Sequence, residues 1–400
     1  MRPRVLMLGW EFPPYKSGGL GTACYDLTKG LAQLGTHVTF VMPFAPDKSH
    51  AEFVKLIGTE AMLKNVKMRA IDSTLRAYQT SESYAAYTGG KKGIYGKNLY
   101  EEVQRYAAVA SRIAKTEKHD VIHAHDWMTY PAAIEARATS KKPLVVHLHA
   151  TEFDRTGGNP DPRIAHIEYN GLRAADAIIT NSHFSKANIL KHYKLPADKI
   201  DVVHWGIDDA QIPNREARAI PEHKTVLFLG RVTIQKGPDY FIEAAKIVSR
   251  HEPNTKFIVV GDGDMLPRLI HRSAELGLAD KVIFTGALRG ADVHKAFQTA
   301  DVYVMPSVSE PFGLVALESI KNGTPVIMSN QSGVSEVVRH ALKADFWDVD
   351  KLAEKITSVL RHLPLRTELS KNALLEARKF TLDVPARKVL DVYSRNILKG

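Results

Sequence analysis

Short apolar runs alternate with longer stretches of helical periodicity along this chain. Strand candidates in the first half are RVLMLGW, HVTFVMP, DVIHAHD, PLVVHLHA, DAIITNS and IDVVHWGID. The stretch GTACYDLTKGLAQLG ends at a stop signal, Gly35, and its apolar residues at helical spacing are Ala23, Leu27, Leu31 and Leu34. After residue 224 the alternation restarts with TVLFLG, a helix over 240–250, KFIVVGDG, KVIFTGA, DVYVMPS and TPVIMSN. Because Val- and Ile-rich strands that alternate with helices form covered parallel sheets, the pattern predicts two α/β units.

A polar segment, DDAQIPNREARAIPEHK, separates the two series of strands and has no periodicity. We therefore predict an N-terminal Rossmann-like domain over residues 1–208, a linker over 209–223, a second Rossmann-like domain over 224–378 and a helical C-terminal segment over 379–400, after a break that contains proline. Doubly wound sheets bind ligands at the carboxyl ends of their strands, so the cleft between the domains is the expected site.

Composition agrees with a protein of two globular domains. The chain has 400 residues, of which 44% are hydrophobic and 24% charged. Its single cysteine, Cys24, excludes an intrachain disulfide, and no apolar run reaches the length of a signal sequence or membrane span, so we expect a cytoplasmic protein. The net charge of +10 favours anionic partners, but Lys and Arg are spread along the chain, which favours a solvated basic surface over a nucleic-acid site.

Two glycine-rich turns follow predicted strands and carry basic residues. KSGGLGT precedes a predicted helix; Gly18 and Gly19 allow close backbone approach there, and Lys16 adds a positive charge. Phosphate binding is favoured over a plain turn, although the turn is neither a Walker A nor a GxGxxG sequence. GRVTIQKG places Arg231 and Lys236 beside glycines, and two cations at the carboxyl edge of a sheet can clamp a diphosphate.

Histidines end two of the predicted strands, in HAHDW and HLHATEFDR. Histidines two residues apart on a strand share one face. A zinc site needs three or four convergent ligands, and no acidic or cysteine partner has metal-ligand spacing, so we expect no metal site. His149 is the candidate to hydrogen-bond a polar substrate, and the other histidines suit core or rim positions.

The stretch SVSEPFGLVALE holds two glutamates, Glu310 and Glu318, among apolar or small residues. Carboxylates in such surroundings are costly unless they are paired. The strand DVYVMPS ends just before Glu310, PFG turns the chain and LVALESI begins a helix, so N–H groups near Phe312, Gly313 and Leu314 would face a phosphate. Glu318 lies about two helical turns further on and could accept hydrogen bonds from a ribose diol.

These motifs occur in an order that resembles a known family. EPFGLVALE matches an E-x7-E signature, and together with GRVTIQKG and KSGGLG the chain resembles retaining glycosyltransferases of GT-B fold, family four and its glycogen and starch synthase relatives, over nearly its whole length. EFPPYKSGGLG is most similar to the N-terminal loop of short archaeal and bacterial glycogen synthases. The resemblance implies two Rossmann-like domains around a central cleft, with a C-terminal helix that crosses back to the N-terminal domain.

The resemblance also implies roles for the donor-binding residues. Arg231 and Lys236 would neutralise the donor diphosphate, and Glu318 would hold the nucleotide ribose. Further donor contacts would come from Lys16, Gly18 and Gly19 at the distal phosphate, from the helix start at Phe312, Gly313 and Leu314, and from backbone around Phe284 and Thr285 at the base.

Two further residues take implied places at the transferred sugar. Glu310 would lie near that sugar and His149 would touch its O6, so the expected catalytic set is Glu310, His149, Arg231 and Lys236. Glu11 matches a loop acid that would meet the acceptor. Glu310 could act as a nucleophile or as an electrostatic and hydrogen-bonding group, and we favour the second.

The implied activity is that of a hexosyltransferase that moves glucose from ADP- or UDP-glucose to an α-glucan end. Cations and a helix N-terminus would stabilise the leaving diphosphate, and no DxD motif stands in the expected place, so we expect no metal requirement and no cofactor. A GDP donor is also compatible with the pattern, and the oligomeric state is open.

Alternative functions fit parts of the same pattern. The acceptor could be a small sugar, a sugar phosphate or a lipid or cell-surface glycan; the lipid version predicts a basic amphipathic face, for which EEVQRYAAVASRIAKTEK is the candidate. A sugar-nucleotide epimerase or hydrolase on this scaffold would turn over donor alone. A non-catalytic nucleotide-sugar or nucleic-acid binding module would tolerate Glu310→Ala and bind with a steep salt dependence.

Overall fold

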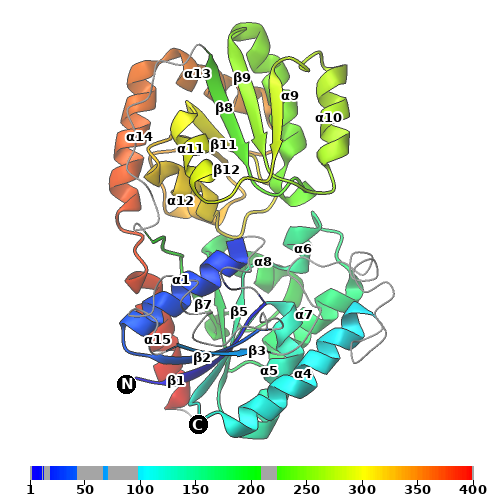
Figure 1. Ribbon diagram of the computed structural model, residues 1–400, viewed down its shortest axis with the longest axis vertical. Helices are drawn as coiled ribbons and strands as arrows, with labels where there is room; N and C mark the ends of the chain where they lie inside the picture. Colours follow the sequence, from blue (N-terminus) through cyan, green and yellow to red (C-terminus); the bar gives the residue numbers. More distant parts are fainter. Residues whose placement is uncertain are drawn as a thin grey trace.

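The computed structural model describes residues 2–10, 12, 19–42, 66–70, 98–208 and 223–398. Within these residues the chain forms two parallel β-sheets flanked by helices, and Figure 1 shows the two resulting α/β units one above the other. The predicted fold class, with two doubly wound domains, is confirmed.

The first sheet has seven strands in the spatial order β3, β2, β1, β4, β5, β6, β7. Its strands are β1 (Arg4–Leu8), β2 (His37–Met42), β3 (Val66–Ala70), β4 (Val121–His125), β5 (Leu144–Leu148), β6 (Ala177–Thr180) and β7 (Ile200–Val202). The order reverses between β1 and β4, which pair through Val5 and Val121. Loops that leave a sheet at such a switch point diverge and make room for a ligand.

The second sheet has six strands and repeats this arrangement in the order β10, β9, β8, β11, β12, β13. Its strands are β8 (Lys224–Leu229), β9 (Thr255–Val260), β10 (Val282–Gly286), β11 (Val302–Met305), β12 (Val326–Ser329) and β13 (Leu342–Ala344). Here the switch point lies between β8 and β11, which pair through Val226 and Val302.

Helices connect the strands in both units. Those around the first sheet are α1 (Gly19–Gln33), α4 (Leu99–Thr116), η1 (Trp127–Thr129), α5 (Tyr130–Ser140), α6 (Glu152–Arg155), α7 (Pro162–Ala174), α8 (His183–Tyr193) and η2 (Ala197–Lys199). Those that follow β8 are η4 (Ile234–Lys236), α9 (Pro238–His251), α10 (Leu266–Glu275), α11 (Ala291–Thr299), α12 (Leu314–Lys321), η5 (Gly333–Glu336), α13 (Val349–Arg361), α14 (Leu363–Ala377) and α15 (Asp383–Ile397).

Alternate residues of the strands enter different hydrophobic cores. In β1, Val5 and Met7 belong to the core that includes α1 and α15, whereas Leu6 and Leu8 belong to the core that includes α4 and α5. This is the period of two expected for a strand buried on both faces. The apolar face of α4 is therefore covered by protein, which removes the exposed apolar face that the lipid-acceptor alternative needs from the EEVQRYAAVASRIAKTEK segment.

The C-terminal helix α15 lies on the first domain. Figure 1 shows α14 beside the second domain and α15 next to α1 on the first. Arg395 Nη2 lies 2.8 Å from Asp201 Oδ1, and the Tyr393 hydroxyl shares a hydrogen bond with His123 Nδ1. The residue limits of the predicted domains and linker stay predictions, and 209–222 lies outside the described residues.

Three features of the fold differ from the expected pattern. Strands β3 and β13 lack long apolar runs; each lies at an edge of its sheet and was not predicted. Pro385 lies in the first turn of α15 instead of in a break before it, because a proline in the first turn removes no intrahelical hydrogen bond.

Among the described residues, no helix combines the length and apolar character that crossing a membrane requires.

Candidate active site

The motifs identified in the sequence lie at the two switch points. GRVTIQKG follows β8 and SEPFG follows β11, so the two loops leave adjacent strands of the second sheet at its carboxyl edge. In the first sheet, HAHDW contains the end of β4, and His149 directly follows β5. The described candidates of both domains thus stand at carboxyl edges, where ligands of such sheets bind.

The loops after β8 and β11 are joined by an ion pair. Lys236 Nζ lies 2.6 Å from Glu310 Oε2, and Ser307 Oγ donates to the same oxygen at 3.1 Å. The Lys236 and Glu310 side chains are 19% and 9% exposed. A carboxylate in this position needs a cation and a hydroxyl beside it, because an isolated buried charge is strongly destabilising.

Glycines let the two loops come this close. Gly237 has φ of 60°, and a Cβ there would lie 2.1 Å from the backbone oxygen of Pro306. Gly313, at the start of α12, has φ of 110°, which side-chain-bearing residues rarely adopt. A glycine is thus required at position 237 by the close approach of the Pro306 backbone and at position 313 by the backbone conformation.

Arg231 belongs to the same loop as Lys236. Its Nη2 donates to Gln235 Oε1 at 3.0 Å, and the backbone oxygen of Gln235 accepts from Val308 N at 3.0 Å. Gln235 is buried and joins Arg231 to the loop after β11. Sequence reasoning missed Gln235 because a neutral side chain carries no charge signal.

The remaining candidates of the second domain lie at or on α12 and on β10. Phe312 is buried, and Leu314 is the first residue of α12. Glu318 lies on α12, and its charge, with that of Glu310, adds to burial in raising the pKa of Tyr303. Phe284 and Thr285 lie on the edge strand β10, where Thr285 is exposed.

His149 belongs to the first domain, where it directly follows β5. Its backbone N donates to Asp126 Oδ1 at 2.8 Å, and its backbone oxygen accepts from Asn181 Nδ2 at 3.1 Å. The His149 ring is stacked on Trp205 with a centroid separation of 5.4 Å. Burial lowers the pKa of His149 well below its usual value, so the ring is neutral at physiological pH.

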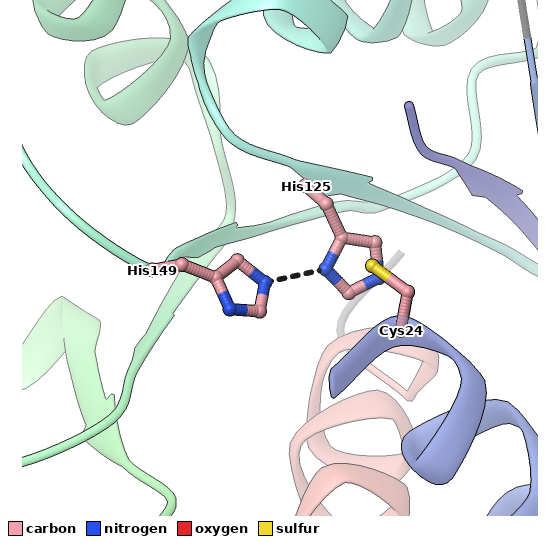
Figure 2. A group of neighbouring side chains, drawn as sticks. All are labelled: Cys24, His125 and His149. Carbon is pink, nitrogen blue, oxygen red and sulfur yellow. Dashed lines mark hydrogen bonds between the residues drawn. The ribbon is translucent and has the colours of Figure 1, made fainter. Parts of the chain in front are cut away.

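His149 belongs to a cluster of four imidazoles. His123, His125 and His147 are fully buried on the face of the first sheet that α1 and α15 cover. His125 Nδ1 lies 2.9 Å from His149 Nε2 (Figure 2). Burial lowers the pKa of His125 well below its usual value and that of His147 to about 3.

Two sets of side chains in this cluster have metal-ligand spacing. One ligand atom from each of Cys24, His125 and His149 lies within 4.8 Å of the others, and so do those of His123, His125 and His147. We found no cysteine partner for the histidines in the sequence, but the fold provides one, since α1 places Cys24 beside His125 (Figure 2). Sequence spacing could not reveal the proximity of Cys24 and His125, because the two residues lie far apart in the chain.

Some predicted residues cannot be placed. Glu11, Lys16 and Gly18 lie outside the described residues, so their roles stay predictions. Gly19, from the same motif, is the first residue of α1 and is exposed.

Comparisons with known proteins agree with this geometry. Residues 17–211 match the family described as Glycosyltransferase Family 4, and residues 211–375 match Glycosyl transferases group 1. An uncharacterized glycosyltransferase of Methanocaldococcus jannaschii is 30% identical to the chain, and the alignment covers 98% of this chain and 97% of that protein. The chain belongs to the glycosyltransferases. It is an enzyme of this family, with the GT-B fold expected from its motifs.

Two other similarities extend this comparison. The glycosyltransferase is 28% identical to a glycogen synthase of Mycobacterium tuberculosis over 89% of this chain and 86% of that protein. Among solved structures, a sucrose-phosphate synthase from Thermosynechococcus elongatus superposes with a TM-score of 0.79 at 21% identity, over 100% of both chains. At 21% identity, the similarity to the sucrose-phosphate synthase shows only that the two proteins share a fold.

The two domains of this glycosyltransferase touch each other next to the candidate site. The backbone oxygen of Pro311 accepts from Ser185 Oγ at 3.1 Å and also from Ser182 Oγ, and Ser309 Oγ donates to Asp154 Oδ1. These bonds join the SEPFG loop to the first domain. Sequence reasoning missed Ser182, the N-cap of α8, and Asp154, which completes the capping box of α6 with Thr151. Such local roles give no hint of a partner in the other domain.

A second bridge between the domains lies at the start of α8. Glu336 Oε2 accepts from the backbone N of His183 at 3.0 Å, Oε1 accepts from that of Phe184, and His204 Nε2 lies 3.3 Å from Oε2. These bonds lower the pKa of Glu336 even though its partial burial opposes them. A pocket of about 430 Å³ between α9 and α10 contains none of the candidate residues and lies apart from both bridges.

Proposed function

We propose that this enzyme moves glucose from ADP- or UDP-glucose to the non-reducing end of an α-glucan, with retention of the anomeric configuration and without a metal ion in the reaction. The observation that carries the proposal is the Lys236–Glu310 pair between two glycine-dependent loops at the carboxyl edge of the second sheet. The similarity to a glycogen synthase over most of both chains supports the choice of acceptor.

The charged residues suit departure of a nucleoside diphosphate. When the bond between C1 of glucose and the phosphate oxygen breaks, negative charge grows on the diphosphate. Lys236 and Arg231 stand where they could stabilise this charge, and backbone N–H groups at the start of α12 add to their effect. Preorganised charges of this kind act most strongly where water is excluded.

Glu310 acts in this proposal as an electrostatic and hydrogen-bonding group. The acceptor hydroxyl attacks C1 from the face that the diphosphate leaves, and its proton passes to the departing phosphate oxygen. Glu310 already has a cation and a hydroxyl as hydrogen-bond partners. On donor binding Lys236 would turn partly to the diphosphate, and Glu310 would accept hydrogen bonds from the sugar.

Further residues complete the donor and acceptor sites. His149 would hydrogen-bond O6 of glucose as an uncharged imidazole, and Glu318 would accept from the ribose hydroxyls. Backbone atoms of Phe284 and Thr285 would meet the base, and Gly18, Gly19 and Lys16 the distal phosphate. Glu11 would face the acceptor.

A sugar phosphate is the second candidate acceptor. The net charge of +10 favours anionic partners, and an acceptor that carries a phosphate is anionic. The donor site and the bond changes would be the same, and only the group that supplies the hydroxyl would differ.

Nucleoside diphosphate release from purified protein tests the proposal. ADP-, UDP- and GDP-glucose are each offered in EDTA with glycogen, with glucose 6-phosphate, or alone. Release that requires glycogen supports the glucan synthase, and release that requires the sugar phosphate supports the second candidate. Release from donor alone at the same rate would instead indicate a hydrolase, conversion of the donor into another nucleotide sugar without release would indicate an epimerase, and no turnover in any mixture would contradict the assigned donor.

A further inference from the structure

The cluster of imidazoles in the first domain contains more ligand atoms than the proposed reaction uses. Only His149 has a place at the sugar. His125 is fully buried, and its Nδ1 is paired with His149 Nε2 although the proposed reaction gives the His125 ring no role.

Figure 2 shows what surrounds His125. The His149 ring points at it from the loop after β5, and the sulfur of Cys24 lies beside it from α1. The sulfur and one ring nitrogen of each histidine lie within 4.8 Å of one another. The three side chains come from three elements that are distant in sequence, α1, β4 and the loop after β5, and they converge on one point.

We propose that Cys24, His125 and His149 bind a thiophilic divalent cation such as Zn²⁺, and that the bound ion inhibits sugar transfer. Thiolate sulfur and neutral imidazole nitrogen are the ligands that zinc prefers, with bonds of about 2.3 Å and about 2.0–2.1 Å. Those bond lengths place tetrahedral ligand atoms roughly 3.3–3.6 Å apart. Ligand atoms that lie within 4.8 Å of one another would have to approach by at most about 1.5 Å to reach these separations.

The hydrogen bond between the two histidines fits the same interpretation. Two neutral imidazole nitrogens 2.9 Å apart require a proton between them, so one ring donates and the other presents a lone pair. A cation can take the place of that proton and bind both rings. Binding also displaces the thiol proton of Cys24 to the solvent, so that the thiolate sulfur forms the third metal bond.

The protein holds the ligands in place from behind. The backbone of His149 is bonded on one side by Asp126 and on the other by Asn181, and the backbone oxygen of His125 accepts from Thr129 Oγ1 at 2.9 Å. Second contacts of this kind orient metal ligands in proteins. Three protein ligands leave a fourth position for water, as in open zinc sites.

A second set, His123, His125 and His147, shares one histidine with the first. Its members are all fully buried, and two of them are held through their other nitrogen by Tyr393 and by Asn181. We favour the set with Cys24 because it contains a thiol and because His149 is only half-buried, whereas every member of the second set is fully buried. The experiment below separates the two sets.

Inhibition rests on the proposed function, whereas binding does not. A metal ion on His149 would occupy the nitrogen assigned to the glucose O6 and would place positive charge where a neutral hydroxyl should lie. Chelation should therefore raise the activity of metal-loaded enzyme, and inhibition should be competitive with the nucleotide sugar.

Binding is measured first, without substrate, on the full chain after removal of metals. Co²⁺ is added to wild type, Cys24→Ser and His147→Asn, and the thiolate-to-cobalt charge-transfer band is followed, while Zn²⁺ affinity is measured by calorimetry. We expect one ion per chain in wild type and His147→Asn. Cys24→Ser should lose the charge-transfer band, and its affinity for Zn²⁺ should fall by at least about a hundredfold. Loss of a residue that only hydrogen-bonds to a metal ligand already lowers metal affinity by about 10- to 100-fold.

Activity is measured second, with buffered Zn²⁺. Cys24→Ser should keep the donor turnover of wild type and lose its inhibition by Zn²⁺; Cys24→Ala replaces it if the serine variant does not fold. Absence of the band, or loss of binding in His147→Asn but not in Cys24→Ser, would overturn the site. Binding without inhibition would overturn the regulatory role, and metal binding by an enzyme that turns over no donor would overturn the proposed function alone.

Discussion

The candidate residues of the two domains offer a ligand different chemistry. We call Arg231, Lys236 and Glu310 the charged wall, and His149, packed against the buried His125 and Trp205, the neutral wall. The charged wall sits on the second sheet, and two of its three members form an ion pair of 2.6 Å. The neutral wall sits on the first sheet, where burial keeps both imidazoles uncharged.

A nucleotide sugar has the same division, since one end carries a charged diphosphate and the other a neutral hexose. Charges that act on the leaving group can lower the barrier to bond cleavage, whereas a neutral hydrogen bond mainly orients the sugar. The comparison therefore predicts that changes in the charged wall cost more activity than changes in the neutral wall.

Loss of Lys236 should have the largest effect. Lys236→Ala removes a cation from the leaving diphosphate and leaves Glu310 buried without its partner. We expect kcat/KM to fall by about a thousandfold, the upper range for removal of one group that stabilises transition-state charge. Initial rates of nucleoside diphosphate release measure it, with Lys351→Ala as the matched control, since Lys351 is 46% exposed on α13. Equal rates in the two variants would remove Lys236 from the site.

Neutralisation of Glu310 should have the next largest effect. Glu310→Gln keeps the shape of the side chain and removes its charge, and we expect kcat to fall by about a hundredfold. An enzyme that used Glu310 as nucleophile would instead lose essentially all turnover, because the amide cannot form the covalent intermediate. Single-turnover kinetics with a trap for a glycosyl-enzyme distinguish the two outcomes.

A change in the neutral wall should have a smaller effect. His149→Ala deletes one hydrogen bond to an uncharged hydroxyl, and such a bond contributes about 1 kcal/mol, or roughly a fivefold to tenfold loss in kcat/KM. His271→Ala is the control, since that side chain is 78% exposed on α10. A loss as large as that of Lys236→Ala would show that the neutral wall takes part in bond cleavage and would break the comparison.

The smallest expected effect concerns the stability of the domain that carries the neutral wall. Burial raises the pKa of Glu168 on α7 to about 7, with Arg155 opposing the shift. Between the unfolded pKa of about 4.5 and the folded value, the folded protein holds a proton that the unfolded chain has lost, so stability falls as pH rises through this window. The slope is at most about 1.4 kcal/mol per pH unit.

Urea unfolding at about pH 5 and about pH 7 measures this slope. Glu168→Gln should be less sensitive to the same change in pH than wild type, because it has no proton to lose. A variant whose stability changes with pH as much as that of wild type would exclude Glu168 as the source of the slope.

How much could be predicted from the sequence differs between the two walls. Lys236 and Glu310 each follow an apolar run, and adjacent parallel strands bring such positions to one edge, so their proximity could be predicted from pattern. The neighbours of His149 could not, because the contact with Cys24 depends on how α1 packs across the sheet. The bonds that Asp154 and Glu336 make depend on how the domains close, which local patterns do not describe.

The most direct test of the account is to measure nucleoside diphosphate and nucleotide-sugar binding by calorimetry in wild type, Lys236→Ala and His149→Ala, in EDTA. If the charged wall binds the diphosphate and the neutral wall binds the hexose, Lys236→Ala should weaken the binding of both ligands. His149→Ala should weaken only the binding of the nucleotide sugar. Unchanged diphosphate binding in Lys236→Ala, or equal weakening of both ligands in His149→Ala, would contradict it.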